Sequence, residues 1–253
     1  MSELVALQPP GSPAPGGSTP TTSKSYDAPN TASGNARPDR NPRGSALQAR
    51  LIAGDEAGAW NLLEAALASG MTPEQVLLEL VAPSLQGIGK LWERGELSIA
   101  DEHRASAVTT RIISRLGPRF SRRGVKRGTV ILAAAPGELH AVPLAIAANM
   151  LRWRGFDVVE LGADTPAAAL AETVAGEPGA VAVGMACTTE AASRSARLVI
   201  AEVRRLAPDM PVFLGGAAIA DATHARRLGA DLSTHGRADE VVRVVEALVA
   251  DRP

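Results

Sequence analysis

Glu138 and His140 stand one residue apart in the stretch APGELHAVP, which directly follows an apolar run. A neutral imidazole can bind a metal ion through one ring nitrogen, and the other nitrogen then needs an acceptor that fixes the tautomer and orientation of the ring. The Glu138 carboxylate could be that acceptor for His140. The alternative is that His140 is a solvated loop histidine, as single loop histidines often are.

Small residues follow two later apolar runs. The stretch GMACTTE contains Cys187, Thr188 and Thr189, which can line a slot and donate hydrogen bonds, and FLGGAAI contains Gly215 and Gly216, which let a ligand lie against bare backbone. Each stretch is also compatible with a strand-to-helix turn that needed small residues. The sequence shows no dinucleotide fingerprint, Walker loop or nucleophile elbow, and its four histidines lack the paired spacing of a structural zinc site.

The order of the apolar runs predicts how these residues are positioned. From residue 128 onward, five short apolar runs alternate with helical segments, which predicts right-handed crossovers and a flavodoxin-like, doubly wound sheet of five parallel strands. Ligands of such sheets lie beyond the carboxyl ends of the strands, where Glu138, His140 and the small residues fall. The expected helices of this domain span residues 144–154, 166–175, 190–206, 218–228 and 238–249.

The chain before residue 128 has a different pattern. Residues 1–44 are rich in Pro, Gly and Ser and predict a disordered tail, which is either a passive extension or a segment with a partner. Residues 45–117 predict a bundle of about four helices, the first around 47–52, with Pro83 kinking or interrupting the third. N-caps are expected at Asp55, Thr72 and Ser98. Residues 118–127 are basic and predict a solvated linker.

Composition limits the classes to which the protein can belong. The 253-residue chain has a formal net charge of -1, which gives no electrostatic argument for binding nucleic acid or an anionic membrane. Its single cysteine excludes an intramolecular disulfide, as expected in the reducing cytosol, and no run of about 18 apolar residues marks a membrane span. We therefore expect a soluble cytoplasmic protein that does not read DNA on its own.

A helical bundle followed by such an α/β domain, with acid-x-His after the first strand and Gly-Gly after the fourth, resembles the cobalamin-binding module of methionine synthase and its relatives. The resemblance covers residues 45–253. It implies that His140 is the lower cobalt ligand, that Glu138 supports it, and that the nucleotide tail of the cofactor enters a slot in the α/β domain. Ala141 and Val142, which follow the histidine in the family motif, are assigned to the same cofactor site.

The chain departs from this family pattern at two places. Pro143 stands where the family has glycine, although proline also fits the first turn of a helix. The family's Ser-x-Leu element is here Ala186, Cys187 and Thr188, so its serine is missing. Thr188 or Thr189 could supply the lost hydroxyl.

A third group of residues lies in LWERGELSIADEH, where Trp92 is followed by nine residues and then by Glu102 and His103. This spacing resembles that of the light-sensing adenosylcobalamin regulators of the CarH type. The resemblance implies that Trp92 and Glu102 pack around the upper adenosyl group and that His103 can bind cobalt once light has removed that group. A flat apolar ring suits adenine, and a helix N-terminus favours the carboxylate. Alternatively, Trp92 is a core residue and the other two face solvent.

The resemblance implies an adenosylcobalamin-binding photoreceptor without enzymatic activity. The predicted tail stands in place of the MerR-type DNA-binding domain of those regulators. We therefore expect signalling through a light-dependent change of the homo-oligomer or through a transcription-regulator partner, as in the stand-alone AerR-type antirepressors. Two alternatives are a corrinoid carrier that shuttles methyl groups between methyltransferases and the small subunit of an adenosylcobalamin mutase.

Overall fold

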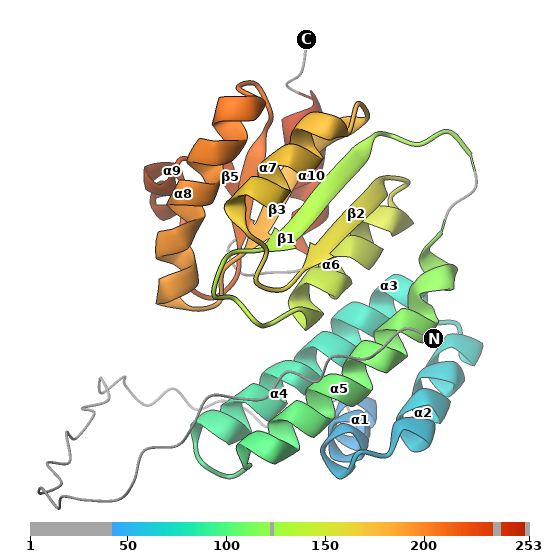
Figure 1. The fold of residues 1–253 in the computed structure, drawn as a ribbon. Coiled ribbons are helices and arrows are strands. Elements are labelled where there is room, and N and C mark those ends of the chain that lie inside the picture. Colours follow the sequence, from blue (N-terminus) through green and yellow to red (C-terminus); the bar gives the residue numbers. More distant parts are fainter. Residues whose placement is uncertain (1–41, 122–123, 235–238, 251–253) are drawn as a thin grey trace, which may run out of the picture. The chain divides into compact units, whose positions relative to one another are not determined.

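The computed structural model describes residues 42–121, 124–234 and 239–250. All of them belong to one compact unit, whose elements are labelled in Figure 1. The predicted tail lies outside the described residues, except for its last three positions, which already belong to the first helix. Within the described ranges, no helix is both long and apolar enough to cross a lipid bilayer.

Four helical stretches precede the sheet in the described part of the chain. They are α1 (Pro42–Ala53), α2 (Glu56–Ala68), the continuous run of α3 (Pro73–Gln75), η1 (Val76–Val81) and α4 (Ala82–Glu93), and α5 (Ile99–Leu116), which the 3-10 helix η2 (Gly117–Phe120) continues. The three predicted N-caps are confirmed. The Asp55 side chain accepts a hydrogen bond from the Gly58 N–H, while Thr72 and Ser98 each form a capping box. These caps define where three of the helices begin.

Pro83 widens the third helix of the bundle without ending it. Proline has no N–H to donate into the helix. The segment directly before it, Val76–Val81, is a π-helix, in which the Ala82 N–H bonds to the Leu77 carbonyl five residues back. The expected interruption therefore takes the form of one wide turn, and α4 continues to Glu93.

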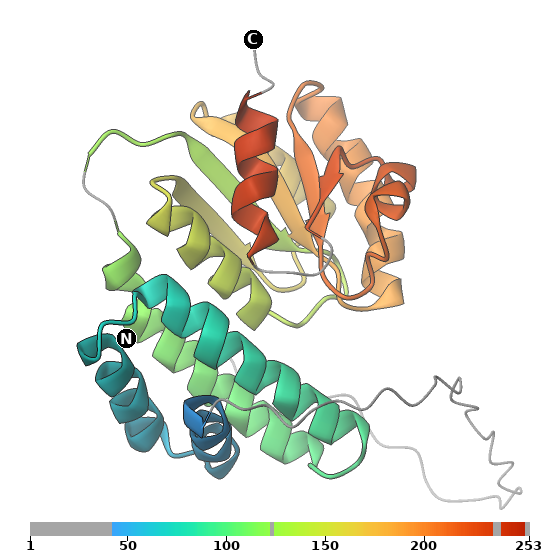
Figure 2. The same ribbon diagram turned by 180° about the vertical axis from the view of Figure 1, so that it is seen from behind.

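The five strands form one parallel sheet in the order β2-β1-β3-β4-β5, which confirms the predicted architecture. The strands are β1 (Thr129–Ala134), β2 (Asp157–Gly162), β3 (Ala180–Ala186), β4 (Val212–Gly215) and β5 (Leu232–Ser233). One face carries α6 (Val142–Trp153) and α10 (Glu240–Ala250), and the other carries α7 (Ala167–Gly176), α8 (Glu190–Leu206) and α9 (Ala222–Leu228) (Figures 1 and 2).

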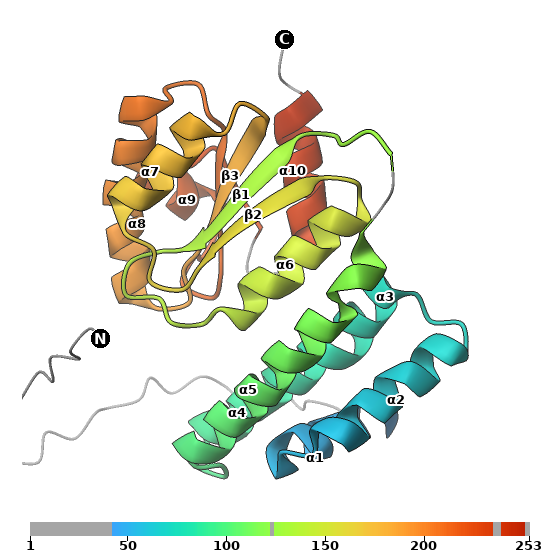
Figure 3. The same ribbon diagram turned by 45° about the vertical axis from the view of Figure 1, so that its right-hand side comes forward.

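Successive side chains of β1 enter two different cores. Val130 and Leu132 pack with α6, α10 and the bundle, whereas Ile131 and Ala133 pack with α7, α8 and α9. This alternation follows from the twofold period of a strand, and burial on both faces explains why the strands read as continuous apolar runs. Contact between α5 and α6 continues the first core into the bundle (Figure 3).

Ligands of doubly wound sheets bind beyond the carboxyl ends of the strands. The chain leaves β1 toward β2 on one side, and it later crosses β1 to reach β3 on the other side. The loops after β1 and β3 therefore diverge at a topological switch point, where doubly wound sheets bind their ligands.

Candidate functional site

A tight turn places Glu138 directly beyond β1. The Glu138 N–H donates to the Ala135 carbonyl at 2.8 Å, and Gly137 has a φ of +82°. Proline followed by a glycine of positive φ is the pattern of a type II turn, so Pro136 and Gly137 account for the geometry. Because the turn reverses the chain, Glu138 comes to lie against the end of β3 before α6 begins at Val142.

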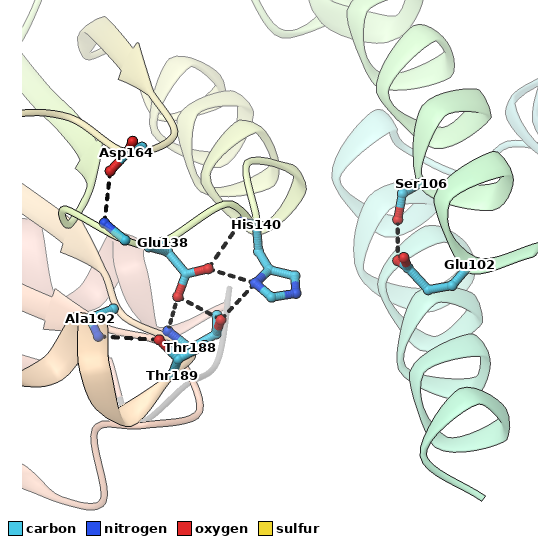
Figure 4. Close-up of polar contacts among 9 residues, drawn as sticks. Glu102, Ser106, Glu138, His140, Asp164, Thr188, Thr189 and Ala192 are labelled. Carbon is cyan, nitrogen blue, oxygen red and sulfur yellow. Dashed lines mark hydrogen bonds and ion pairs between the residues drawn. The ribbon is translucent and has the colours of Figure 1, made fainter. Parts of the chain in front are cut away.

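The Glu138 side chain is fully buried, and both of its oxygens are hydrogen bonded (Figure 4). Oε1 accepts from the His140 N–H at 2.9 Å and lies 2.6 Å from His140 Nδ1. Oε2 accepts from the Thr188 hydroxyl at 2.6 Å and from the Thr188 N–H. Because a carboxylate only accepts, Nδ1 must carry a proton, and Nε2 is the ring nitrogen that does not face Glu138, on a side chain that is 61% exposed.

The surroundings of Glu138 keep it ionised. Burial by itself raises the pKa of Glu138, but the hydrogen bonds donated by Thr188 and His140 outweigh burial and lower the pKa from 4.5 to about 2. A carboxylate at neutral pH is therefore available to hold His140 in a single tautomer. The contact with Nδ1 leaves Nε2 as the ring nitrogen that could bind a metal ion, in the arrangement usual for metal-binding histidines.

We expect Glu138→Gln to lower the free energy of unfolding of the ligand-free protein by about 1–3 kcal/mol near neutral pH, because an amide N–H₂ would face groups that are themselves donors. Since the folded-state pKa is depressed, the contribution of the carboxylate is complete above the unfolded value of 4.5 and is lost as the pH falls toward 2. Urea unfolding of wild type and variant at several pH values measures both effects.

The control for this experiment is Glu190→Gln, which changes a side chain that is 89% exposed. The difference in stability between the wild type and Glu138→Gln should shrink steadily as the pH falls, and Glu190→Gln should match the wild type throughout. A difference that stays constant down to about pH 2 would show that the Glu138 hydrogen bonds do not stabilise the ionised form.

A pocket of about 590 Å³ opens at the carboxyl ends of β1, β3 and β4. Its floor consists of small residues of the strand ends, namely Gly184, Ala186, Gly215 and Gly216. Leu132 and Phe213 form apolar walls, and Leu78, Ala82 and Leu85 add side chains from the bundle. Thr188 belongs both to the pocket lining and to the hydrogen bonds around Glu138, so the pocket begins beside the histidine.

Bare backbone at the end of β4 is required by packing. Gly216 has a φ of +108°, and a Cβ there would lie 2.2 Å from the Cys187 carbonyl oxygen. A Cβ on Gly215 would lie 2.5 Å from the Thr234 hydroxyl. The pocket wall therefore has no side chains at these two positions, and an extended ligand can approach the backbone itself.

The helical hairpin of α4 and α5 positions Trp92, Glu102 and His103, here called the hairpin group. Trp92 lies in the last turn of α4, which ends at Glu93. Gly95 (φ +71°) follows in a Schellman motif, in which N–H groups beyond the helix bond to carbonyls of its last turn. Ser98 then caps α5, which places Glu102 and His103 near its start. The nine-residue spacing thus brings the group to one end of the hairpin.

The members of the hairpin group differ in exposure. Trp92 is 46% exposed, so it is no core residue, and the His103 side chain is 72% exposed. The Glu102 carboxylate accepts a hydrogen bond from the Ser106 hydroxyl at 2.6 Å (Figure 4). It also lies 3.7 Å from His103 Nε2. A second acceptor oxygen of Glu102 therefore stays available to a ligand.

Trp92 shares a helix face with residues of the pocket. Leu85 and Trp92 are seven residues apart in α4, which is almost two full turns, so they lie along one stripe. Gly89 occupies the same stripe between them, and a Cβ there would meet nothing within 4 Å. The stripe is therefore apolar at both ends and open in the middle, which suits a broad flat ligand.

The two threonines after β3 have different roles. Thr188 bonds to Glu138 and lies 2.9 Å from His140 Nδ1. Thr189 instead caps α8, where its hydroxyl accepts from the Ala192 N–H at 3.2 Å. Of the two threonines, Thr188 is therefore the one that lies beside His140 and lines the pocket.

Three other predicted residues do not line the pocket. The Cys187 side chain is fully buried in the core on the α8 face, and burial raises the pKa of its thiol to about 12. Ala141 precedes α6 and Val142 is its first residue, whereas the pocket is lined by the next residue, Pro143, in the first turn. Side chains at a strand end point to alternate faces, which explains why Cys187 turns away.

Asp164 also contacts the turn after β1, although no sequence motif marks it. Its Oδ1 accepts a hydrogen bond from the Gly137 N–H at 2.8 Å, in the turn that carries Glu138. The available signal was its place after the second strand, at the same edge of the sheet as Glu138 and Thr188.

A bundle joined to a doubly wound sheet, with a buried carboxylate orienting an exposed imidazole beside an apolar, glycine-walled pocket, defines a corrinoid-binding type of protein. Two family models, each described as a B12 binding domain, match residues 45–116 and 128–246. The chain therefore belongs to the cobalamin-binding family.

The similar proteins include corrinoid proteins and a transcriptional repressor. Trimethylamine corrinoid protein 1 of Methanosarcina acetivorans is 27% identical over 202 residues, which cover 77% of this chain and 92% of that protein. The HTH-type transcriptional repressor CarH of Myxococcus xanthus is 33% identical over 190 residues, which cover 74% and 62%. The solved Methanosarcina barkeri monomethylamine corrinoid protein matches with a TM-score of 0.70 and 18% identity over 81% of this chain and 96% of that one, which shows a shared fold.

Proposed function

We propose that the protein is an adenosylcobalamin-binding light sensor that regulates transcription and has no enzymatic activity of its own. The observation that carries the proposal is the hairpin group, in which Trp92, Glu102 and His103 gather at one end of the α4–α5 hairpin. Trp92 also continues the helix face that lines the pocket. The similarity to the CarH repressor gives further support.

The residues of the sheet edge fit the lower side of such a cofactor. His140 would hold the cobalt through Nε2, while Glu138 keeps the proton on Nδ1 and Thr188 fixes Glu138. The pocket beside Thr188 is largely apolar, and its wall has no side chains at Gly215 and Gly216, so it would take the nucleotide tail. A nitrogen donor and an apolar slot are the two features that a corrinoid with a displaced base requires.

The hairpin group fits the upper side. Trp92 offers a half-exposed ring for an adenine, and Glu102 has a free oxygen to accept hydrogen bonds from ribose hydroxyls. Bound adenosylcobalamin supplies a cobalt–carbon bond that visible light cleaves. Trp92 and Glu102 would then lose the group they hold, and His103 is exposed and free to turn toward the vacated space. Repacking around these residues is the two-state element that a switch needs.

The output is proposed to pass through a protein. Balanced charge argues against direct DNA binding, so we favour a transcription-regulator partner or a light-dependent change in the number of copies that associate.

A corrinoid methyl carrier is the second candidate, and the named relatives favour it over light sensing. Several of them carry the name corrinoid protein, and the chain covers nine tenths of their length, against 62% of the CarH repressor. Against this candidate stands the hairpin group, because a carrier needs an accessible upper face for its substrate.

An absorption spectrum and an elution profile of the protein with adenosylcobalamin, taken in the dark and after green light, test the proposal. We expect a lasting spectral change and a change in elution. Trp92→Ala should bind adenosylcobalamin about fivefold more weakly relative to methylcobalamin, since an aromatic stack contributes on the order of 1 kcal/mol. Ile99→Ala, which removes another exposed apolar side chain from the same hairpin, is the control.

Cobalamin binding with neither a lasting photoproduct nor a change in size would reject light sensing and favour the carrier. Transfer of a methyl group from a methyltransferase to the bound corrinoid would support the carrier directly.

A further inference from the structure

The loop after β2 contains a strained residue at the ligand edge of the sheet. Asp164 has a φ of +48°, and among the described residues all other positive φ values belong to glycines. Left-handed backbone is unfavourable for residues with a side chain, although aspartate and asparagine tolerate it best. Such a conformation persists only where surrounding contacts impose it, and it marks a site worth explaining.

The contacts that impose it all reach the turn that carries Glu138. The Asp164 carboxylate accepts from the Gly137 N–H at 2.8 Å, and the Asp164 N–H donates to the Glu138 carbonyl at 2.9 Å (Figure 4). The next residue adds a third hydrogen bond, in which the Thr165 N–H donates to the Ala134 carbonyl at 3.0 Å. The loop after β2 therefore holds the turn at both of its ends.

The Asp164 side chain is not needed to close its own loop. The Thr165 hydroxyl already bridges that loop by donating to the Gly162 carbonyl at 3.1 Å. Asp164 is exposed, so its side chain fills no core position. Its carboxylate instead reaches a turn 27 residues earlier in the chain. A strained, exposed residue whose contacts all lie on another loop serves that loop.

We propose that Asp164 is a positioning residue for the lower ligand. By holding Gly137 and Glu138 in place, it sets the direction in which Glu138 presents His140 Nε2. This inference rests on the proposed binding of a corrinoid through His140, and it adds an outer support beyond the Glu138–Thr188 pair. Outer groups of this kind typically change metal affinity by about 10- to 100-fold.

Two substitutions at this position separate the hydrogen bond from the strain. Asp164→Asn keeps an acceptor oxygen and a residue that tolerates positive φ, so it should bind cobalamin within about threefold of wild type. Asp164→Gly relaxes the backbone but removes the acceptor. We expect it to bind about 10- to 100-fold more weakly and to show a reduced fraction of the histidine-ligated absorption spectrum. Titration with hydroxocobalamin, followed by absorption, gives both readouts.

Urea unfolding of the ligand-free proteins serves as the structural control, and Asp164→Gly should be as stable as the wild type within the loss of one exposed hydrogen bond. A wild type that binds no cobalamin, or a His140→Ala protein with an unchanged spectrum, would reject the proposed site itself. If His140→Ala is altered and Asp164→Gly matches the wild type, Asp164 has no positioning role. The same conclusion follows if Asp164→Asn is as impaired as Asp164→Gly, or if Asp164→Gly does not fold.

Discussion

His140→Ala is expected to fold normally and to bind hydroxocobalamin at least about 100-fold more weakly than the wild type. Loss of an outer group that supports a metal ligand typically weakens binding about 10- to 100-fold, and loss of the ligand itself should weaken binding at least as much. The side chain is 61% exposed, so its removal leaves no cavity in the core. Glu138 and Thr188 would then orient no ligand. Absorption should change with affinity, because the lower nitrogen ligand of the cobalt would be lost.

The matched control is His224→Ala. His224 lies on α9, where its ring contacts the Ala220 N–H and the Ser193 hydroxyl rather than the pocket. The His224→Ala protein should bind cobalamin with the same affinity as the wild type. Added imidazole should partly restore the spectrum of His140→Ala, since it returns the missing nitrogen to the same place. An unchanged spectrum and affinity in His140→Ala would mean that another group occupies the lower position.

Gly216→Ala should reduce the free energy of unfolding of the ligand-free protein by about 3 kcal/mol or more, because it combines backbone strain with overpacking. Gly216 has a φ of +108°, and the added Cβ would lie 2.2 Å from the Cys187 carbonyl oxygen, which is backbone and cannot swing away. The end of β4 would have to shift from β3. Cobalamin affinity should fall with it, because this backbone forms a wall of the pocket.

Gly95→Ala separates the two causes. Gly95 also has a positive φ, +71°, but a Cβ there would meet nothing within 4 Å. Gly95→Ala should therefore lower the free energy of unfolding by about 1–2 kcal/mol, which is the contribution of backbone strain alone. Urea unfolding of both variants measures the comparison. Equal losses would indicate that the close approach of Gly216 to Cys187 is relieved cheaply, and that packing does not require glycine at this position.

The elements were predictable where a local pattern decides them. Ser98 and Thr72 carry their capping partners three residues away, so the sequence shows the helix starts directly. Apolar runs buried on both faces likewise indicate parallel strands. The prediction of a helix over residues 218–228 was wrong at its start, since α9 begins at Ala222. Among the intervening residues, the Ala218 N–H bonds to the Cys187 carbonyl, a contact between distant segments that no local signal reports.

The site shows the same division. Glu138 and His140 are two residues apart, and their pairing follows from the sequence alone. The choice of Thr188 over Thr189 depends on the parallel register of β1 and β3, in which Ala134 pairs with Ala186. The role of Asp164 could not be predicted, because Asp164 follows β2 and meets Gly137 only after β2 has paired with β1.

The π-helix at Val76–Val81 determines the direction in which the side chains of α4, the helix that continues from it, point. Each residue of an α-helix turns the chain by about 100°, so a helix shortened by one residue here would rotate Leu85 and Trp92 away together while the cap at Thr72 stayed in place. Side-chain changes in this segment would be local events. A change in its length would instead act at the C-terminal end of α4, where it would redirect the aromatic ring of Trp92. For this segment the number of residues therefore matters more than their identity.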